Sequence, residues 1–82
     1  MAQHEIITPV PGTFYRTPGP GKPPYVTEGE HIDTGQVVGL VEIMKQFSEI
    51  KSSVAGVVLS FSIADHDDVA PGMVIALVDD GL

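Results

Sequence analysis

One lysine stands out as a side chain placed for chemistry. In "VGLVEIMKQFSEIKSS" (38–53), Lys45 separates two runs that have the character of β-strands. Two strands separated by two residues form a tight hairpin, so Met44 and Lys45 are predicted to be the central pair of its turn. Asn-Gly or Asp-Gly would suit that turn better. Because this choice lowers stability without a structural return, we expect Lys45 to be functional.

A cluster of acidic residues is the next candidate. The segment "ADHDDVAPG" (64–72) has the composition of a metal site. Contiguous side chains cannot all converge on one ion, and the four candidate ligands are contiguous: Asp65, His66, Asp67 and Asp68. We therefore expect a polar turn before a strand, and no metal.

The remaining reactive side chains do not form a catalytic group. Glu42 and Glu49 flank the hairpin, where a solvated face or a contact with a modifying enzyme accounts for them. Ser52, Ser53 and His31 do not follow the order or the local pattern of a nucleophile elbow. No catalytic residue is predicted, and the chain is not expected to be an enzyme by itself.

The charge balance limits the partners. Eleven acidic residues against four lysines and arginines give a net charge of -7, which disfavours nucleic acid and anionic membranes. We expect protein partners instead. The absence of cysteine excludes disulfides and thiol chemistry. Neither a signal peptide nor an apolar run of the ~20 residues that cross a bilayer is evident, so a cytoplasmic location is predicted.

The composition favours strands. Hydrophobic residues make up 43% of the chain and are dominated by valine and isoleucine, which prefer pleated, half-buried surfaces. Nine glycines and seven prolines interrupt the chain too often for long helices. A length of 82 residues suits a single domain. We predict one all-β domain spanning residues 1–82.

The chain contains the same pattern twice. Residues 31–42 align with 68–79 without a gap, and residues 8–15 align with 52–59. The offsets of the two alignments differ by seven residues, so the first half carries an insertion. The insertion is assigned to "RTPGPGKPPY" (16–25), which is half proline and glycine and is predicted to be a stiff projecting loop.

Two repeats of this length predict a flattened eight-stranded β-barrel or sandwich. Each repeat would close the other's apolar face across a pseudo-twofold axis. Four aromatic residues are assigned to the core or to the base of the projecting loop: Phe14, Tyr15, Phe47 and Phe61. The predicted strands are 4–8, 12–15, 29–32, 37–43, 46–51, 56–61, 67–69 and 74–78.

The hairpin sequence resembles a known modification motif. "VEIMKQF" is similar to the biotin-attachment motif of biotinyl domains, whose usual form is Glu-Ala-Met-Lys-Met. Glu42, Met44 and Lys45 match it. Ile43 and Gln46 replace the usual alanine and methionine.

The upstream sequence extends the resemblance over nearly the whole chain, from about Ile6 to Val78. It resembles the biotin carboxyl carrier subunits of bacterial acetyl-CoA carboxylases, which have a proline-rich protrusion called the thumb. Residues 17–25 take that place and are called the thumb below. The matching positions are Pro9, Gly12, Thr13, Phe14, Tyr15, Arg16, Pro18 and Pro20.

The resemblance implies a barrel-sandwich hybrid of two four-stranded antiparallel sheets, with the lysine at a hairpin tip (residues 44–45). It implies a non-catalytic carrier for fatty acid biosynthesis or another biotin-dependent pathway. Lys45 would carry carboxybiotin between a biotin carboxylase and a carboxyltransferase, after attachment by biotin protein ligase. The ligase would recognise Glu42, Ile43, Met44 and Gln46. The thumb would contact biotin through Pro18, Gly19, Pro20, Gly21, Lys22 and Pro23.

Two alternatives remain open. One is a lipoyl-type acyl carrier domain, which shares the fold and a hairpin lysine. Such domains usually have Asp-Lys-Ala at the tip and no thumb, and Met44 and Gln46 match neither flank of the lysine. The other is an unmodified protein-interaction module of the same fold.

Overall fold

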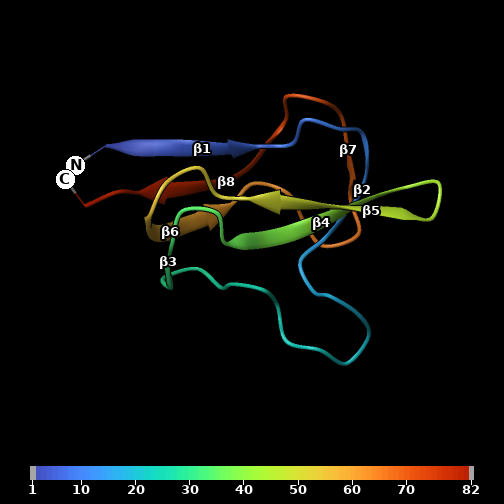
Figure 1. Ribbon diagram of the computed structural model, residues 1–82, viewed down its shortest axis with the longest axis horizontal. Coiled ribbons are helices and arrows are strands. Elements are labelled where there is room, and N and C mark those ends of the chain that lie inside the picture. The colour runs from blue at the N-terminus through green and yellow to red at the C-terminus, as the bar shows by residue number, and fades with distance from the viewer. Residues whose placement is uncertain (1, 82) are drawn as a thin grey trace.

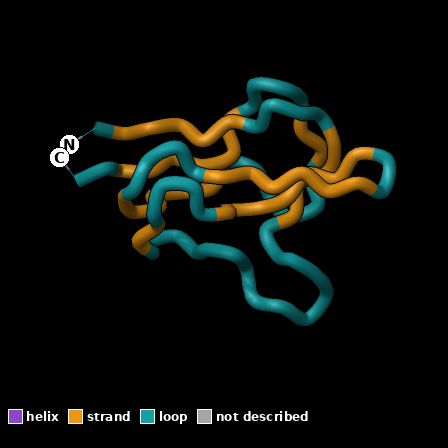
Figure 2. The backbone as a smooth tube through the Cα atoms, in the orientation of Figure 1, coloured by secondary structure: helices purple, strands orange, loops and turns teal. Residues whose placement is uncertain are grey.

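Two four-stranded antiparallel sheets make up the protein, as the computed structural model of residues 2–81 shows (Figure 1). One sheet has the order β1-β8-β6-β3 and the other β5-β4-β2-β7. Residues 2–81 contain no helix, and therefore none that could span a membrane (Figure 2). The strands are β1 (Gln3–Ile7), β2 (Gly12–Tyr15), β3 (His31–Ile32), β4 (Val37–Ile43), β5 (Gln46–Lys51), β6 (Gly56–Phe61), β7 (Asp68–Val69) and β8 (Val74–Asp79).

The predicted all-β fold is confirmed, and so are the predicted strands, with ends displaced by two residues at most. The largest displacement is at β3, predicted to begin at residue 29 and observed to begin at His31. Gly29 has φ 90°, a left-handed conformation that a strand does not contain. The molecule is flattened as predicted, with principal extents of 39 × 28 × 19 Å.

The sequence repeat is also a repeat of the topology. The alignment offsets make β1, β2, β3 and β4 equivalent to β5, β6, β7 and β8. Replacing each strand of one sheet by its equivalent gives the order of the other sheet. Each sheet therefore takes two strands from each half of the chain, and neither half forms a sheet alone.

Equivalent side chains make equivalent hydrogen bonds in the two halves. The Thr8 hydroxyl donates to the Val10 carbonyl at 2.6 Å, and the Ser52 hydroxyl donates to the Val54 carbonyl at 2.6 Å. Both hydroxyls belong to fully or almost fully buried side chains, and buried polar groups are costly when unpaired. Ser52 thus has a structural role at the turn that follows β5.

The core lies between the sheets and draws on both halves. Phe14 is fully buried at its centre, and Phe61 packs beside it with ring centroids 6.3 Å apart. The other buried apolar side chains of this cluster are Ile6, Val26, Ile32, Val38, Val41, Ile50, Val58, Val69, Ile75, Ala76 and Val78.

Two equivalent glycines permit close contact between strands. A Cβ atom at Gly12 would lie 2.2 Å from the Glu42 carbonyl oxygen, and one at Gly56 would lie 2.2 Å from the Asp79 carbonyl oxygen. No side chain fits at such a separation without movement of the backbone. Glycine is therefore required at both positions by the packing of β2 on β4 and of β6 on β8.

Replacing Gly56 with alanine is expected to lower the free energy of unfolding by about 1–3 kcal/mol, because overpacking forces neighbouring backbone apart. Chemical denaturation measures this change. Gly19→Ala is the matched control, since a Cβ atom there meets nothing within 4 Å. Equal stability of the two variants would contradict the close contact.

Candidate functional site

The hairpin between β4 and β5 has the turn that the sequence predicts. Ile43 pairs with Gln46, which leaves Met44 and Lys45 as the two central residues. Their φ angles are 50° and 67°, both in the left-handed region, as in a type I′ turn. Residues other than glycine seldom adopt this conformation. The turn is therefore strained at the lysine and at the residue before it.

The tip projects away from both sheets (Figure 1). The Met44 side chain is 91% exposed, which is unusual for a large apolar residue. Lys45 is exposed, and its amine has no hydrogen bond or ion pair with any of the residues described. Ile43 packs against the core, whereas Gln46 is exposed. Of the residues flanking Lys45, Met44 and Gln46 are thus the most accessible to another protein.

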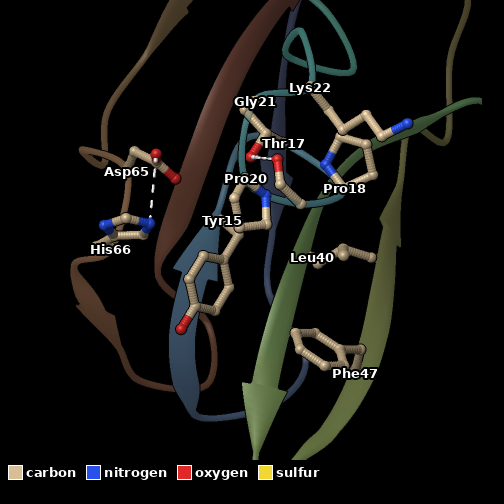
Figure 3. A pocket seen from close by; sticks show the side chains of 11 residues that line it. Tyr15, Thr17, Pro18, Pro20, Gly21, Lys22, Leu40, Phe47, Asp65 and His66 are labelled. Carbon is tan, nitrogen blue, oxygen red and sulfur yellow. Dashed lines mark hydrogen bonds and ion pairs between the residues drawn. The ribbon is translucent and has the colours of Figure 1, made fainter.

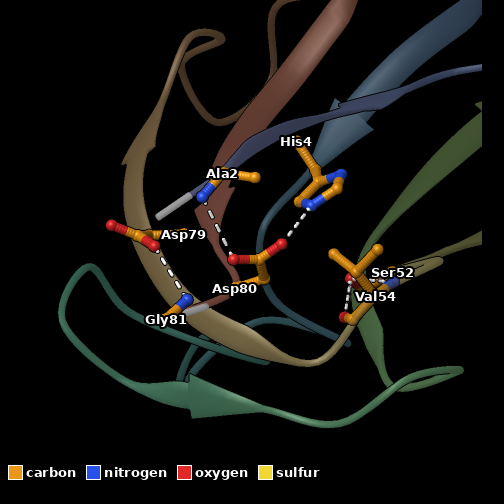
Figure 4. Close-up of polar contacts among 7 residues, drawn as sticks. All are labelled: Ala2, His4, Ser52, Val54, Asp79, Asp80 and Gly81. Atoms are coloured by element: carbon orange, nitrogen blue, oxygen red, sulfur yellow. Dashed lines mark hydrogen bonds and ion pairs between the residues drawn. The ribbon is translucent and has the colours of Figure 1, made fainter.

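The opposite end of the molecule holds the chain termini, in the place equivalent to the hairpin tip (Figures 1 and 4). By the repeat offsets, Ala2 corresponds to Gln46 and Asp80 to Ile43. The Asp80 amide donates to the Ala2 carbonyl at 3.0 Å, and the Asp80 carboxylate accepts from the Ala2 amide at 3.1 Å. Its other oxygen lies 2.7 Å from His4 Nε2. One end thus presents Lys45 on a turn, whereas the described residues of the other end join Ala2 to Asp80 by hydrogen bonds.

Glu42 and Glu49 lie in different surroundings, although both flank the hairpin in the sequence. Glu49 lies on the solvated face, as predicted, and is 55% exposed. Glu42 is half-buried, and its carboxylate accepts a hydrogen bond of 2.9 Å from the Tyr15 hydroxyl. This bond raises the pKa of Tyr15 above its ordinary value, with smaller effects from burial and from the charges of Glu42 and Asp65. The sequence analysis missed this contact between β2 and β4.

A cavity of about 500 Å³ lies between the thumb and the sheet that carries the hairpin (Figure 3). The Tyr15 ring lines it, with the Phe47 ring centroid 6.1 Å away on one side and the His66 ring centroid 5.0 Å away on the other, nearly edge-on (Figure 3). Phe47 is 58% exposed, so it belongs to the cavity and not to the core. The lining residues are Tyr15, Thr17, Pro18, Gly19, Pro20, Gly21, Lys22, Leu40, Phe47, Asp65 and His66.

The thumb supplies one side of this cavity. Five of the six residues assigned to biotin contact line it, whereas Pro23 is exposed and does not. A hydrogen bond from the Lys22 amide to the Gly19 carbonyl at 3.2 Å forms its internal turn. The thumb residues that line the cavity are thus presented by a defined turn, which the sequence predicted only as a projecting loop.

Arg16 holds the base of the thumb. Its carbonyl accepts from the Tyr25 amide at 2.9 Å, which closes the loop. Its guanidinium lies 4.0 Å from the centre of the Phe61 ring and 3.1 Å from a Glu28 carboxylate oxygen. The pKa of Glu28 is lowered by its own backbone amide and by the Arg16 hydrogen bond. These contacts attach both ends of the thumb to the core.

The acidic segment at residues 64–72 contacts β2 and the residue that follows it, which lie far away in the sequence. Asp65 accepts a hydrogen bond from the Arg16 amide at 2.9 Å. Asp68 and the Thr13 hydroxyl are 3.5 Å apart. Between residues 2 and 81 no three histidine, aspartate or glutamate side chains are grouped so that they could hold a metal ion.

Comparison with known protein families shows which family this chain belongs to. Residues 4–78 match the biotin/lipoyl family, which is described as "Biotin-requiring enzyme". The match includes both sheets, the thumb and the hairpin tip. The chain therefore belongs to this family.

Several curated proteins are similar to the chain. The biotin carboxyl carrier protein of acetyl-CoA carboxylase 2 from Arabidopsis thaliana chloroplasts is 40% identical over 79% of this chain and 26% of the relative. The carrier protein from Nostoc sp. is 38% identical over 79% of this chain and 36% of the relative. The carrier protein from Chlamydia muridarum is 39% identical over 82% of this chain and 41% of the relative. The chain thus spans about a quarter to two fifths of the length of these relatives.

The fold also occurs in a much larger protein. The crystal structure of urea carboxylase from Kluyveromyces lactis superposes with a TM-score of 0.80 and 19% identity, over 96% of this chain and 6% of that one. At this identity the likeness shows a shared fold. It agrees with the two-sheet architecture described above.

Met44→Asn is expected to raise the free energy of unfolding by about 1 kcal/mol, because asparagine tolerates the left-handed conformation better than methionine. Chemical denaturation of the unmodified protein measures the change. Met44→Leu serves as the control and should leave stability nearly unchanged, since the side chain is exposed. No gain for the asparagine variant would show that the turn is not strained at this residue.

Glu42→Ala is expected to lower the pKa of Tyr15 toward its ordinary value, because the hydrogen bond that raises it is lost. Tyrosinate absorbance against pH, in a Tyr25→Phe background, reports on Tyr15. Since the folded state holds this proton more tightly, the contact stabilises the fold below the ordinary pKa of tyrosine, and this stability is lost as the pH rises through the raised pKa. Glu49→Ala is the control, because it removes an equal charge without removing a contact to Tyr15. An equal change in the Tyr15 pKa in both variants would contradict the role of the Glu42 hydrogen bond.

Proposed function

We propose that the chain is the biotin-bearing region of a biotin carboxyl carrier protein that serves a biotin-dependent carboxylase. The carrier role is supported by family membership and by the names of the three curated relatives described above, each a biotin carboxyl carrier protein of acetyl-CoA carboxylase. The observation that carries the proposal is Lys45 on a strained, projecting turn, without a side-chain partner among residues 2–81. The proposed setting is a carboxylase related to acetyl-CoA carboxylase that serves fatty acid biosynthesis, and the proposed location is the cytoplasm.

The tip residues fit an attachment site for biotin. The Lys45 amine is exposed and free to form an amide with the carboxyl group of biotin, which would take the net charge of the chain from -7 to -8. Once attached, biotin supplies the chemistry of carrying a carboxyl group, as cofactors do generally. The protein supplies a rigid hairpin that holds the attachment point away from both sheets.

Recognition by a biotin protein ligase is proposed to involve the whole tip. Met44 and Gln46 offer exposed side chains next to the lysine. Ile43 anchors the end of β4 in the core, and the Tyr15 hydroxyl orients the Glu42 carboxylate. The ligase would thus meet a hairpin whose flanking residues are already fixed, which lowers the entropy that binding must overcome.

The projecting position also suits the later partners. A biotin carboxylase and a carboxyltransferase must each reach the same lysine, and a tip that stands clear of the sheets allows both. A long arm on a rigid support raises the effective concentration of its end group at each partner. The acidic surface, with a net charge of -7, favours partners with basic or neutral docking faces.

The cavity beside the thumb is the proposed resting place of the biotin ring. Phe47 lies two residues along β5 from Lys45, a distance of ~7 Å at the usual rise of a strand. The arm formed by the lysine stem and the biotin chain is longer than this, so its end can fold back to the cavity. Tyr15, Leu40 and Phe47 present apolar surface there.

Coexpression with a biotin ligase tests the proposal. Intact-mass measurement should show one biotinyl group on the protein and none on the Lys45→Arg variant, which keeps the positive charge but cannot form the amide in the same way. A second acceptor protein confirms that the ligase is active. An unmodified chain under those conditions would overturn the proposal, and a lipoyl adduct from cells would support a lipoyl carrier instead.

A further inference from the structure

The four lysine and arginine side chains of this acidic protein differ in whether they have a partner. Arg16 pairs with Glu28 at 3.1 Å, and Lys51 lies 3.8 Å from Glu49. Lys45 is the proposed attachment point and would lose its charge on modification. Lys22 is the remaining one, and it makes no side-chain hydrogen bond or ion pair with the residues described. A modified protein would therefore have one unpaired basic side chain of these four.

Lys22 lines the cavity beside the thumb (Figure 3). Its amide donates to the Gly19 carbonyl, so the turn of the thumb sets its position. One acidic residue lines the cavity, Asp65, and both of its carboxylate oxygens have partners. One Asp65 oxygen accepts from the Arg16 amide at 2.9 Å, and the other lies 3.6 Å from His66 Nε2. An anion entering the cavity would therefore find its free partner at Lys22.

His66 forms another side of the cavity and breaks the internal repeat. Its equivalent in the first half is Gly29, and both residues donate their amides at 2.7 Å to equivalent carbonyls, of Phe14 and Val58. The φ angles are 71° at His66 and 90° at Gly29. Glycine adopts this conformation freely, whereas a side chain there is strained. A strained histidine that packs edge-on against Tyr15 indicates that the cavity requires its ring.

We propose that Lys22 binds the carboxylate of carboxylated biotin, while the ring rests between the thumb and His66. This inference rests on the proposed function. Carboxylation changes the end of the arm from neutral to anionic, and a protein with a net charge near -8 repels an anion over most of its surface. The positive charge of Lys22 would attract an anion at the cavity. The cavity would therefore bind the carboxylated arm more tightly than the uncarboxylated one.

Binding at Lys22 has a chemical consequence for the loaded arm. Spontaneous loss of CO₂ breaks the bond between a ureido nitrogen and the carboxylate carbon. The electron pair stays on the nitrogen, which takes a proton from water and leaves hydroxide, and CO₂ departs. Because negative charge departs from the carboxylate oxygens, a cation beside them stabilises the group before the bond breaks. Lys22 would thus slow the loss of the carboxyl group between visits to the two partners.

Matched charge variants test this inference. Biotinylated protein is carboxylated with a biotin carboxylase, ATP and labelled bicarbonate, then separated, and the loss of label is followed. Lys22→Met should shorten the half-life of the label about twofold to fivefold, the range expected for an ion pair at a partly open site. Lys51→Met removes the same charge outside the cavity and should match the wild type, as should Lys22→Arg.

Two further measurements separate binding from other effects. Amide resonances of Gly19 and Gly21 should shift on carboxylation in the wild type and not in Lys22→Met. His66→Gly should also shorten the half-life of the label, although it relieves strain. Equal half-lives for Lys22→Met and Lys51→Met would overturn the inference and leave the carrier function standing. Failure of Lys45 to accept biotin would overturn both.

Discussion

The structure depends on the exchange of strands between two halves that cannot fold separately. A unit of about 40 residues is too small to bury a sufficient core without help. Each sheet therefore takes two strands from each half, and Phe14 and Ile75, from different halves, are both fully buried in the shared cluster. The buried hydroxyls of Thr8 and Ser52 complete equivalent turns. The result is a packed support for a short hairpin, which suits the proposed role as carrier of a long flexible arm.

The places where the two halves differ are the places where function is proposed. A strained turn with Lys45 at one end corresponds to the hydrogen-bonded pair of Ala2 and Asp80 at the other. The thumb has no equivalent in the second half. His66 stands where the first half has Gly29. The thumb and His66 meet at one cavity, which also includes Phe47 from the strand that follows the tip.

The basic side chains of the scaffold have partners, whereas those of the proposed site have none among residues 2–81. Arg16 is held between Phe61 and Glu28 and fastens the thumb to the core. Tyr15 connects the cavity to the tip, since its ring lies in the cavity while its hydroxyl holds Glu42. Lys22 and Lys45 are left without partners among the described residues. Lys45 is the proposed attachment point, and Lys22 is the proposed partner of the carboxylate.

Local patterns determined most of the fold. Strand-favouring composition, the two-residue spacing of the hairpin and the internal repeat predicted the eight strands, the Met44-Lys45 turn and the projecting thumb. Strands and tight turns depend mainly on residues close together in the chain. Only the tertiary structure decided that Tyr15 holds Glu42, and that His66 and Lys22 line one cavity. These contacts join segments far apart in the sequence, and their geometry follows from how the sheets pack and how the thumb folds back.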